Sequence, residues 1–135
     1  MNYGFIKVAS AVPSVKVADC KYNVEQIVQQ IILAEGQGVE IIVFPELSLT
    51  GYTCQDLFRQ NLLLETTESA MLMLLDFTRQ LNIISIVGLP IAVGDLLLNC
   101  AAIIQKGQIL GIVAKEYLPN YNEFYEKRWF ASVQD

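Results

Sequence analysis

Two charged residues stand where apolar segments of this chain end, and both are residue types that carry proton-transfer chemistry. Glu46 directly follows Pro45 after the run VEIIVF, and Lys115 follows the run ILGIVA. Apolar neighbours desolvate a carboxyl group and raise its pKa, so Glu46 could act as a general base near neutral pH. A protonated Lys115 could stabilise an oxyanion. The alternatives are a solvated or helix-capping glutamate and a lysine that extends into water.

Further candidates lie close to these two residues in the sequence. Tyr52 follows Glu46 and Tyr121 follows Lys115 within a few residues. Each tyrosine could place its hydroxyl over a substrate, or its ring could simply pack against neighbours. Glu126 and Glu123 are further carboxylates in the polar and aromatic carboxyl-terminal segment, where an ordinary surface charge is the alternative.

The sequence contains no histidine and three cysteines, Cys20, Cys54 and Cys100. Without histidine, neither a Ser-His-Asp nor a Cys-His catalytic group can form within this chain. The cysteines are odd in number and widely spaced, so they indicate neither a disulfide framework nor a zinc motif. We therefore predict three structural thiols in a reducing cytoplasm, with no metal site. Dinucleotide-binding and phosphate-loop motifs are also missing, so no cofactor is expected in this segment.

Composition limits the class of protein and of partner. The chain has 135 residues, the size of one domain, and is 53% hydrophobic with only 17% charged residues. Such a sequence is not disordered, and it indicates that something outside the chain covers apolar surface. The net charge of -5 argues against nucleic acid as a partner, and no apolar run is long enough to span a membrane.

The elements that must position the candidate residues alternate between strands and helices. Residues with helical spacing follow Asn23, which we interpret as a helix N-cap with Gln26 as its capping-box partner, and Gly36 and Gly38 end that helix. A second helix is predicted at about Glu68 to Gln80. Apolar and β-branched runs predict strands at 4–12, 39–44 and 83–90, the last two buried on both faces.

This order, β-α-β-α-β, implies parallel neighbouring strands joined by right-handed crossovers. The runs 99–105 and 109–115 then flank Lys106 and Gly107, which predicts a hairpin. The expected sheet is therefore mixed. The carboxyl ends of strands in α/β sheets are where ligands bind, and Glu46 and Lys115 both follow such ends.

Two longer segments resemble the catalytic blocks of a known family. VFPELSLTGY (43–52) resembles the first catalytic block of the nitrilase superfamily, the carbon-nitrogen hydrolases, and AKEYLPNYNEFYEKRWF (114–130) resembles the second. The aromatic residues of the second block are closest to the amino-terminal glutaminase domains of glutamine-dependent NAD synthetases. The resemblance implies an α/β fold, the nitrilase-like α-β-β-α sandwich with a mixed sheet. Residues 1–135 would form only its amino-terminal part.

The resemblance also implies roles for the candidate residues. In this superfamily a cysteine attacks a carbonyl or nitrile carbon, a glutamate takes the thiol proton, and a lysine stabilises the tetrahedral intermediate. Mapped by motif, Glu46 would be the base and Lys115 the oxyanion partner. The glutamine pocket would be lined by Tyr52 and Tyr121. Glu126, or else Glu123, would correspond to the second glutamate of the family.

The chain departs from the family pattern in one respect. The nucleophilic cysteine of the family follows a strand downstream of the lysine block, and no cysteine follows Lys115 here. We therefore expect the remainder of this domain to lie outside the chain, and residues 1–135 alone to be inactive.

By resemblance, the complete enzyme would hydrolyse glutamine and pass the ammonia to an ATP-dependent amidation of deamido-NAD. ATP and magnesium would bind in a separate synthetase domain, and the enzyme would be a homo-oligomer. The alternatives are a stand-alone amidase of the same superfamily and a non-catalytic oligomerising domain.

Overall fold

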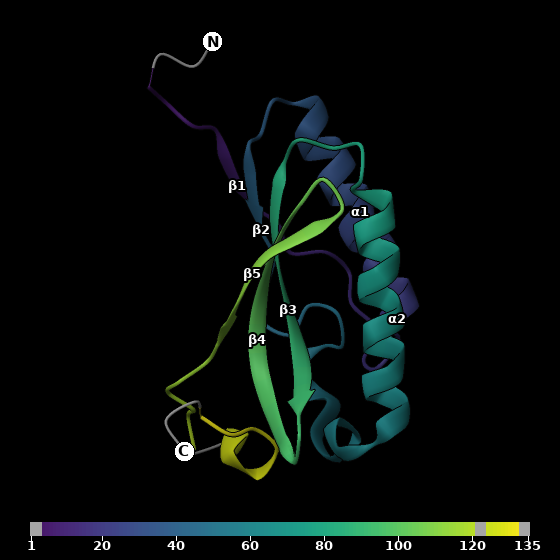
Figure 1. Cartoon of the computed structure of the whole chain (residues 1–135), viewed down its shortest axis with the longest axis vertical. Helices are drawn as coiled ribbons and strands as arrows, with labels where there is room; N and C mark the ends of the chain where they lie inside the picture. Colours follow the sequence, from purple (N-terminus) through teal and green to yellow (C-terminus); the bar gives the residue numbers. More distant parts are fainter. Residues whose placement is uncertain (1–3, 121–123, 133–135) are drawn as a thin grey trace.

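The structure is a computed structural model that describes residues 4–120 and 124–132. One mixed sheet of five strands carries two long helices on one of its faces (Figure 1). The elements in chain order are β1 (Val8–Ser10), α1 (Cys20–Gly36), β2 (Ile41–Val43), the 3-10 helix η1 (Tyr52–Arg59), α2 (Asn61–Phe77), β3 (Ile84–Val93), β4 (Leu96–Gln105), β5 (Gln108–Ala114) and the 3-10 turn η2 (Glu126–Arg128).

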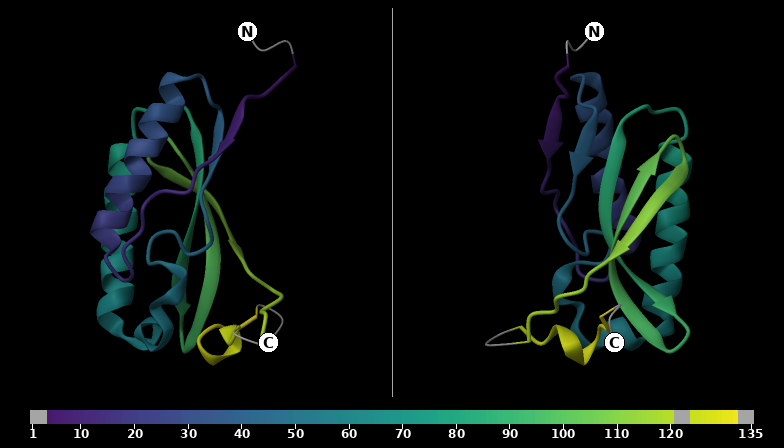
Figure 2. Two further views of the ribbon diagram at one scale, coloured as in Figure 1. Left: turned by 180° about the vertical axis from the view of Figure 1, so that it is seen from behind. Right: turned by 60° about the vertical axis from the view of Figure 1, so that its left-hand side comes forward.

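The strand order is the order of the sequence, β1-β2-β3-β4-β5. The pairs β1–β2 and β2–β3 are parallel, whereas β3–β4 and β4–β5 are antiparallel, so the predicted mixed sheet is confirmed. Both crossovers proceed in the same direction across the sheet, and right-handed crossovers then place both helices on the same face. Figure 2 shows α1 and α2 side by side against that face.

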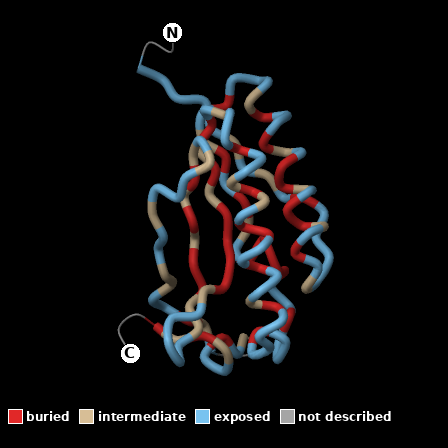
Figure 3. Tube along the Cα trace, turned by 45° about the vertical axis from the view of Figure 1, so that its right-hand side comes forward, coloured by how far each residue is buried: buried red, intermediate tan, exposed pale blue. Residues whose placement is uncertain are grey.

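The hydrophobic core lies between the two helices and the sheet, where the buried segments of Figure 3 gather. Ile27 and Ile31 of α1, Leu74 of α2, and Val87 and Ile104 of the sheet are all essentially inaccessible to water. Fully burying a side chain of this size contributes roughly 1.5–3 kcal/mol. The helical spacing predicted for the first helix therefore matches the face that α1 buries, except at Ile32, which was predicted on that face and is 56% exposed.

The second face of the sheet is open among the described residues. Val43 is 42% exposed, and its cross-strand neighbours Ile86 and Ile103 are only partly buried. The prediction that 39–44 and 83–90 are buried on both faces is therefore wrong for this part of the fold. The physical reason is that both crossover helices lie on the opposite face.

The start of α1 also differs from the prediction. Asp19 is the N-cap, because its carboxylate accepts a hydrogen bond from the backbone N–H of Tyr22 at 3.1 Å. Asn23 lies inside the helix and is completely buried. Its side-chain amide donates to the carbonyls of Lys16 and Leu49, each at 2.9 Å, and so links the segment before α1 to the loop after β2. The predicted helix end is confirmed, since α1 ends at Gly36.

The other element boundaries agree with the sequence prediction at one hairpin and differ from it elsewhere. The hairpin at Lys106 and Gly107 is confirmed, with φ of 52° and 75° as a two-residue primed turn requires. A second hairpin, at Gly94 and Asp95, joins β3 to β4 and was not predicted. The second helix begins at Asn61 rather than near 68. No side chain caps its start, so the sequence carries no capping signal for its first residue. No described helix combines the length and apolar character needed to cross a membrane.

Candidate active site

The loop that carries Glu46 is docked directly on β3. Leu49 donates its backbone N–H to the carbonyl of Gly88 at 3.1 Å, and the N–H of Gly88 donates to Oγ of Ser48 at 3.1 Å. A Cβ atom at Gly88 would lie only 2.3 Å from the backbone nitrogen of Leu47. The absence of a side chain at Gly88 is therefore what allows the Glu46 loop to lie this close to the strand.

Lys115 reaches the site from the end of β5. Its backbone N–H donates to the carbonyl of Asn99 at 2.8 Å, which extends the pairing of β5 with β4 by one step. The Nζ atom of Lys115 lies 2.8 Å from Oε1 of Glu46 and 2.9 Å from Oε1 of Glu126. The structure thus brings together three residues that the sequence analysis selected separately.

Glu126 is the buried member of this group, with 2% of its side chain exposed. One carboxylate oxygen accepts from Lys115, and the other accepts from the Tyr52 hydroxyl at 2.6 Å. Its backbone N–H donates to the Pro119 carbonyl at 3.2 Å, and its carbonyl accepts from the N–H of Phe130 at 2.8 Å. A carboxylate is stable at such depth only when its charge is paired and hydrogen-bonded, and both conditions are met here.

The charge of Lys115 is stabilised by its two carboxylate partners. Burial works against the ammonium, but the hydrogen bonds to Glu46 and Glu126, with their negative charges, outweigh it, so the pKa of Lys115 lies above its ordinary value. Lys115 therefore stays protonated at neutral pH. One positive and two negative charges leave this cluster with a net charge of -1, and a permanent cation at its centre is suited to stabilising a developing oxyanion.

Glu46 is more open to water than its apolar neighbours in the sequence led us to expect, with 41% of its side chain exposed. A group that exchanges protons with a bound substrate must be reachable, and this exposure provides access. Tyr52 reaches the same site, but its hydroxyl donates to Glu126 rather than pointing to an open space. Tyr121 and Glu123 lie outside the described residues.

Sequence reasoning missed Asn99. Its Nδ2 donates to Oε1 of Glu46 at 2.5 Å, and the residue is 3% exposed in the middle of the sheet. A signal was present, because Asn99 interrupts the apolar run of β4, and a polar side chain buried in a sheet needs a partner. The sequence does not say which partner it has, because Glu46 lies more than fifty residues away.

The three cysteines are free thiols, and all are buried, as structural residues are. Cys54 donates to the carbonyl of Thr50 at 3.2 Å. Burial raises the pKa of the Cys54 and Cys100 thiols above the ordinary value, so both are held as unreactive thiols. None of these sulfur atoms is hydrogen-bonded to Glu46 or Lys115.

A second charged group, which we call the surface clamp, holds the last described segment against η1. It consists of Asp56, Arg128 and Trp129. The Arg128 guanidinium donates two hydrogen bonds to the Asp56 carboxylate, at 2.9 and 3.1 Å, and Trp129 Nε1 donates a third at 3.1 Å. The ring of Phe58, also in η1, packs on the ring of Phe130, and the two ring centroids lie 4.9 Å apart. Because Tyr52 begins η1 and Glu126 begins η2, the clamp holds these two site residues together.

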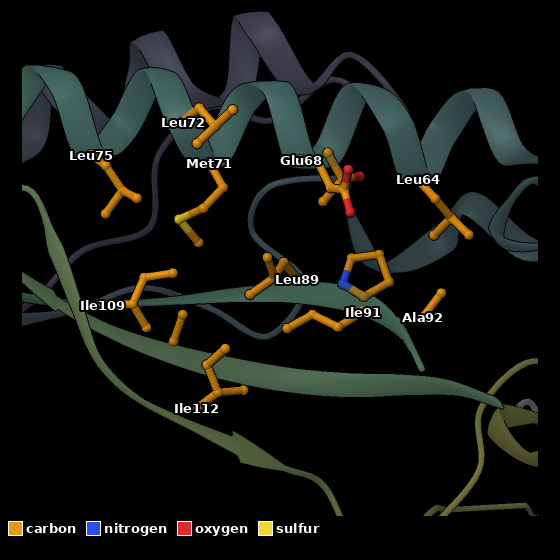
Figure 4. Close-up of a pocket in the computed structure, with 13 residues that line it drawn as sticks. Leu64, Glu68, Met71, Leu72, Leu75, Leu89, Ile91, Ala92, Ile109 and Ile112 are labelled. Atoms are coloured by element: carbon orange, nitrogen blue, oxygen red, sulfur yellow. The ribbon is translucent and has the colours of Figure 1, made fainter. Parts of the chain in front are cut away.

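A separate apolar hollow of about 320 Å³ lies between α2 and the strands β3 to β5 (Figure 4). Leu64, Met71 and Leu75 of α2 point toward Leu89 and Ile112 across it. Among the described residues of its lining Glu68 is the only ionisable one, and Glu46, Lys115 and Glu126 do not contribute to it. The candidate chemistry is therefore not located there. Within 4–120 and 124–132, no group of three or more metal-ligating side chains comes together.

Known proteins resemble this chain in sequence and in fold. Residues 7–134 match the family described as carbon-nitrogen hydrolase. The chain is 35% identical over 134 residues to a glutamine-dependent NAD(+) synthetase of Mycobacterium leprae, covering 99% of this chain and 20% of that protein. It is 41% identical over 119 residues to the enzyme of the same name from Aquifex aeolicus, covering 88% of this chain and 21% of that protein. The chain therefore spans about a fifth of the length of these relatives.

Solved structures confirm the predicted fold. The crystal structure of a glutamine-dependent NAD(+) synthetase from Cytophaga hutchinsonii superposes with a TM-score of 0.88 at 31% identity, covering 94% of this chain and 22% of that one. An amidase from Nesterenkonia superposes with a TM-score of 0.82 at 21% identity, covering 97% of this chain and 51% of that one. At that identity the amidase shows the shared fold alone.

Proposed function

We propose, from the premise that the chain belongs to the carbon-nitrogen hydrolase family, that it forms the amino-terminal part of a glutamine-hydrolysing domain. The observation that carries the proposal is the position of Lys115, whose Nζ lies 2.8 and 2.9 Å from the carboxylates of Glu46 and Glu126. A base and a fixed cation meet there beside strand ends, where α/β folds bind their ligands. Glutamine as the substrate is supported by the names of the relatives.

In the proposed mechanism Glu46 is the general base. A cysteine from outside this chain loses its proton to Glu46, and its sulfur forms a bond to the amide carbon of glutamine. Lys115 stabilises the negative charge that develops on the amide oxygen. The proton then passes to the amide nitrogen, the carbon-nitrogen bond breaks and ammonia leaves. Water, deprotonated by Glu46, hydrolyses the thioester to glutamate and restores the thiol.

We further propose that the ammonia amidates deamido-NAD in a synthetase domain outside this chain. This is supported by the names of the relatives, of which the chain covers only 20–21%, and by a related synthetase of Acinetobacter baumannii that was solved with ADP. We assign ATP and magnesium to that synthetase domain.

The open face of the sheet supports the proposal that other chain segments cover this part of the fold. Val43 and Val113 are 42% and 61% exposed there, which is unusual for β-branched side chains of a sheet. We propose that the second half of the sandwich covers this face and that the complete enzyme is a homo-oligomer. The free thiols support a reducing cytoplasm as its location.

The test is the release of ammonia from glutamine by the full-length protein that contains this chain. Glu46→Gln removes the base and should lower kcat by roughly 10²- to 10⁴-fold. Lys115→Ala removes the oxyanion partner and should lower kcat by roughly 10²- to 10³-fold. Glu25→Gln, an exposed glutamate on the outside of α1, is the matched control and should keep full activity.

Each alternative has its own outcome in this experiment. Full activity in either site variant would remove the assigned roles. A wild-type protein that hydrolyses other amides but not glutamine would be a stand-alone amidase. A wild-type protein that hydrolyses no amide and forms a stable oligomer would be a non-catalytic oligomerising domain. Ammonia release by wild type that falls in both site variants supports the proposal.

A further inference from the structure

Asn99 is an uncharged residue that forms a hydrogen bond with the carboxylate of Glu46. It lies on β4 opposite Pro90 of β3, is 3% exposed, and donates its Nδ2 hydrogen to Oε1 of Glu46 at 2.5 Å. The orientation of the amide follows from chemistry. If the amide were turned over, its oxygen would face a carboxylate oxygen at that distance, and two acceptors repel each other. The NH2 group therefore faces Glu46.

Both donors to Glu46 reach the same oxygen. Asn99 Nδ2 and Lys115 Nζ both approach Oε1, at 2.5 and 2.8 Å, and no donor to Oε2 is recorded among the described residues. A carboxylate held through one oxygen by two donors cannot rotate freely about its last bond. The other oxygen, Oε2, then keeps a fixed direction and remains available to accept a proton.

We propose that Asn99 is a positioning residue that holds Glu46 with Oε2 directed toward the reacting thiol. The backbone of the Glu46 loop is already fixed on β3 through Gly88. Asn99 fixes the far end of the same residue from β4. A base that is held at both ends spends little time in unproductive orientations. Correct placement of the base accounts for much of the rate advantage that an enzyme provides. This inference rests on the proposed function of Glu46 as the base.

A neutral donor is suited to this position. Lys115, just after β5, contacts Glu46 and also Glu126 of η2, which accepts from Tyr52 of η1, and this hydrogen-bonded group contains a single positive charge. A second cation at position 99 would compete with Lys115 for both carboxylates, and a third carboxylate would repel them. An amide adds a hydrogen bond to the ionised base without altering the charge of the cluster.

The experiment compares Asn99→Ala and Asn99→Asp in the full-length protein, with Ser85→Ala as the control. Ser85 is also buried in the sheet, and its hydroxyl has no hydrogen-bond partner among the described residues, so its loss tests packing alone. Asn99→Ala should lower kcat for glutamine hydrolysis by about 10- to 100-fold, with KM within about twofold, because a misplaced base affects the chemical step.

Asn99→Asp separates positioning from simple packing. The two side chains have the same shape, so a packing role would make Asn99→Asp the milder change. Positioning by an N–H donor makes it the more severe one, because a carboxylate at 99 repels Glu46 and competes for Lys115. A milder effect of Asn99→Asp, or an Asn99→Ala enzyme whose kcat is unchanged, would overturn the proposal.

A crystal structure of the Asn99→Ala protein provides a readout that does not depend on activity. We expect the Glu46 carboxylate to leave its wild-type orientation while Lys115 stays on Glu126. A Glu46 carboxylate that is unchanged in position would also overturn the proposal. If wild type itself releases no ammonia, the proposed function fails, and the orientation of Glu46 in this structure still decides whether Asn99 positions it.

Discussion

Two charged groups hold the last described segment to the rest of the chain, and they do so in opposite environments. The first group, which we call the inner cluster, consists of Glu46, Lys115 and Glu126. Lys115 lies between the two carboxylates, and Glu126 is 2% exposed. In the surface clamp, Arg128 and Asp56 are 58% and 66% exposed. The clamp has the more favourable pairing, with two hydrogen bonds from one guanidinium to one carboxylate, yet water and salt screen it. Burial therefore decides which pair the fold depends on.

The largest effect should come from removing the cation of the inner cluster. Lys115→Met leaves Glu126 buried without its positive partner, and we expect the free energy of unfolding to fall by about 3–5 kcal/mol. Urea unfolding followed by Trp129 fluorescence measures this change. Lys21→Met, at an exposed position of α1, is the control and should change little.

A double variant sharpens this first prediction. Adding Glu126→Gln to Lys115→Met removes the uncompensated charge, so it should recover part of the lost stability. If the double variant were less stable than Lys115→Met alone, the cost of Lys115→Met would not come from the uncompensated charge of Glu126.

An intermediate effect should follow from moving Glu46 without removing any charge. In Gly88→Ala the new Cβ would lie 2.3 Å from the backbone nitrogen of Leu47, so the loop must shift. We expect a loss of about 1–3 kcal/mol in urea unfolding, as in other overpacked sites, together with a fall in glutamine hydrolysis. Gly111→Ala is a matched control, because a Cβ at Gly111 meets no atom within 4 Å. Equal effects at the two glycines would contradict this interpretation.

The smallest effect should come from the surface clamp, and the pH dependence of its contribution to stability should appear only in acid. Hydrogen bonds from Arg128 and Trp129 lower the pKa of Asp56 to about 2, from an ordinary value of 3.8. Its contribution to stability is therefore complete above pH 3.8 and is lost as the pH falls toward 2. Asp56→Asn should flatten that part of the curve of unfolding free energy against pH, and 1 M salt should weaken the wild-type dependence.

Asp76→Asn provides the comparison for the clamp. Asp76, in the last turn of α2, forms an exposed pair with Arg79 just beyond the end of that helix, so its removal leaves η1 and η2 in contact. The acid dependence between pH 4 and 2 should survive in Asp76→Asn and be reduced in Asp56→Asn. Lys115 of the inner cluster should affect stability at high pH instead. Its pKa is raised, so its contribution to the free energy of unfolding is lost only in strongly alkaline solution.

Residues at the ends of strands were predictable from the sequence, because a polar residue after an apolar run marks a carboxyl end whatever the tertiary structure. Glu46 and Lys115 were found in this way, and the hairpin at Lys106 and Gly107 followed from its turn residues. The choice of helix cap was not predictable, since Asp19 and Asn23 are both favourable capping residues and lie one helical turn apart. Only the tertiary contact of Asn23 with Leu49 shows why it lies inside the helix.

Asn99 illustrates what the sequence could not supply. Its burial could be anticipated from the apolar residues around it, but its partner depends on how the β2 loop is placed over β3, which the sequence pattern does not encode. The same is true of Tyr52 and Glu126, whose hydrogen bond joins residues at opposite ends of the site. Long-range pairings of this kind depend on the register of the whole sheet.

The distances along the chain between these partners have a consequence for how the domain assembles. Glu46 and Lys115 are 69 residues apart, and Tyr52 and Glu126 are 74 apart, so neither hydrogen bond can form until strands β2 to β5 have joined. Closing such long segments is entropically costly, and local helices and hairpins form first. During synthesis the site should therefore be completed last. Substitutions in it should accelerate unfolding more than they slow folding, which stopped-flow measurements in urea would show.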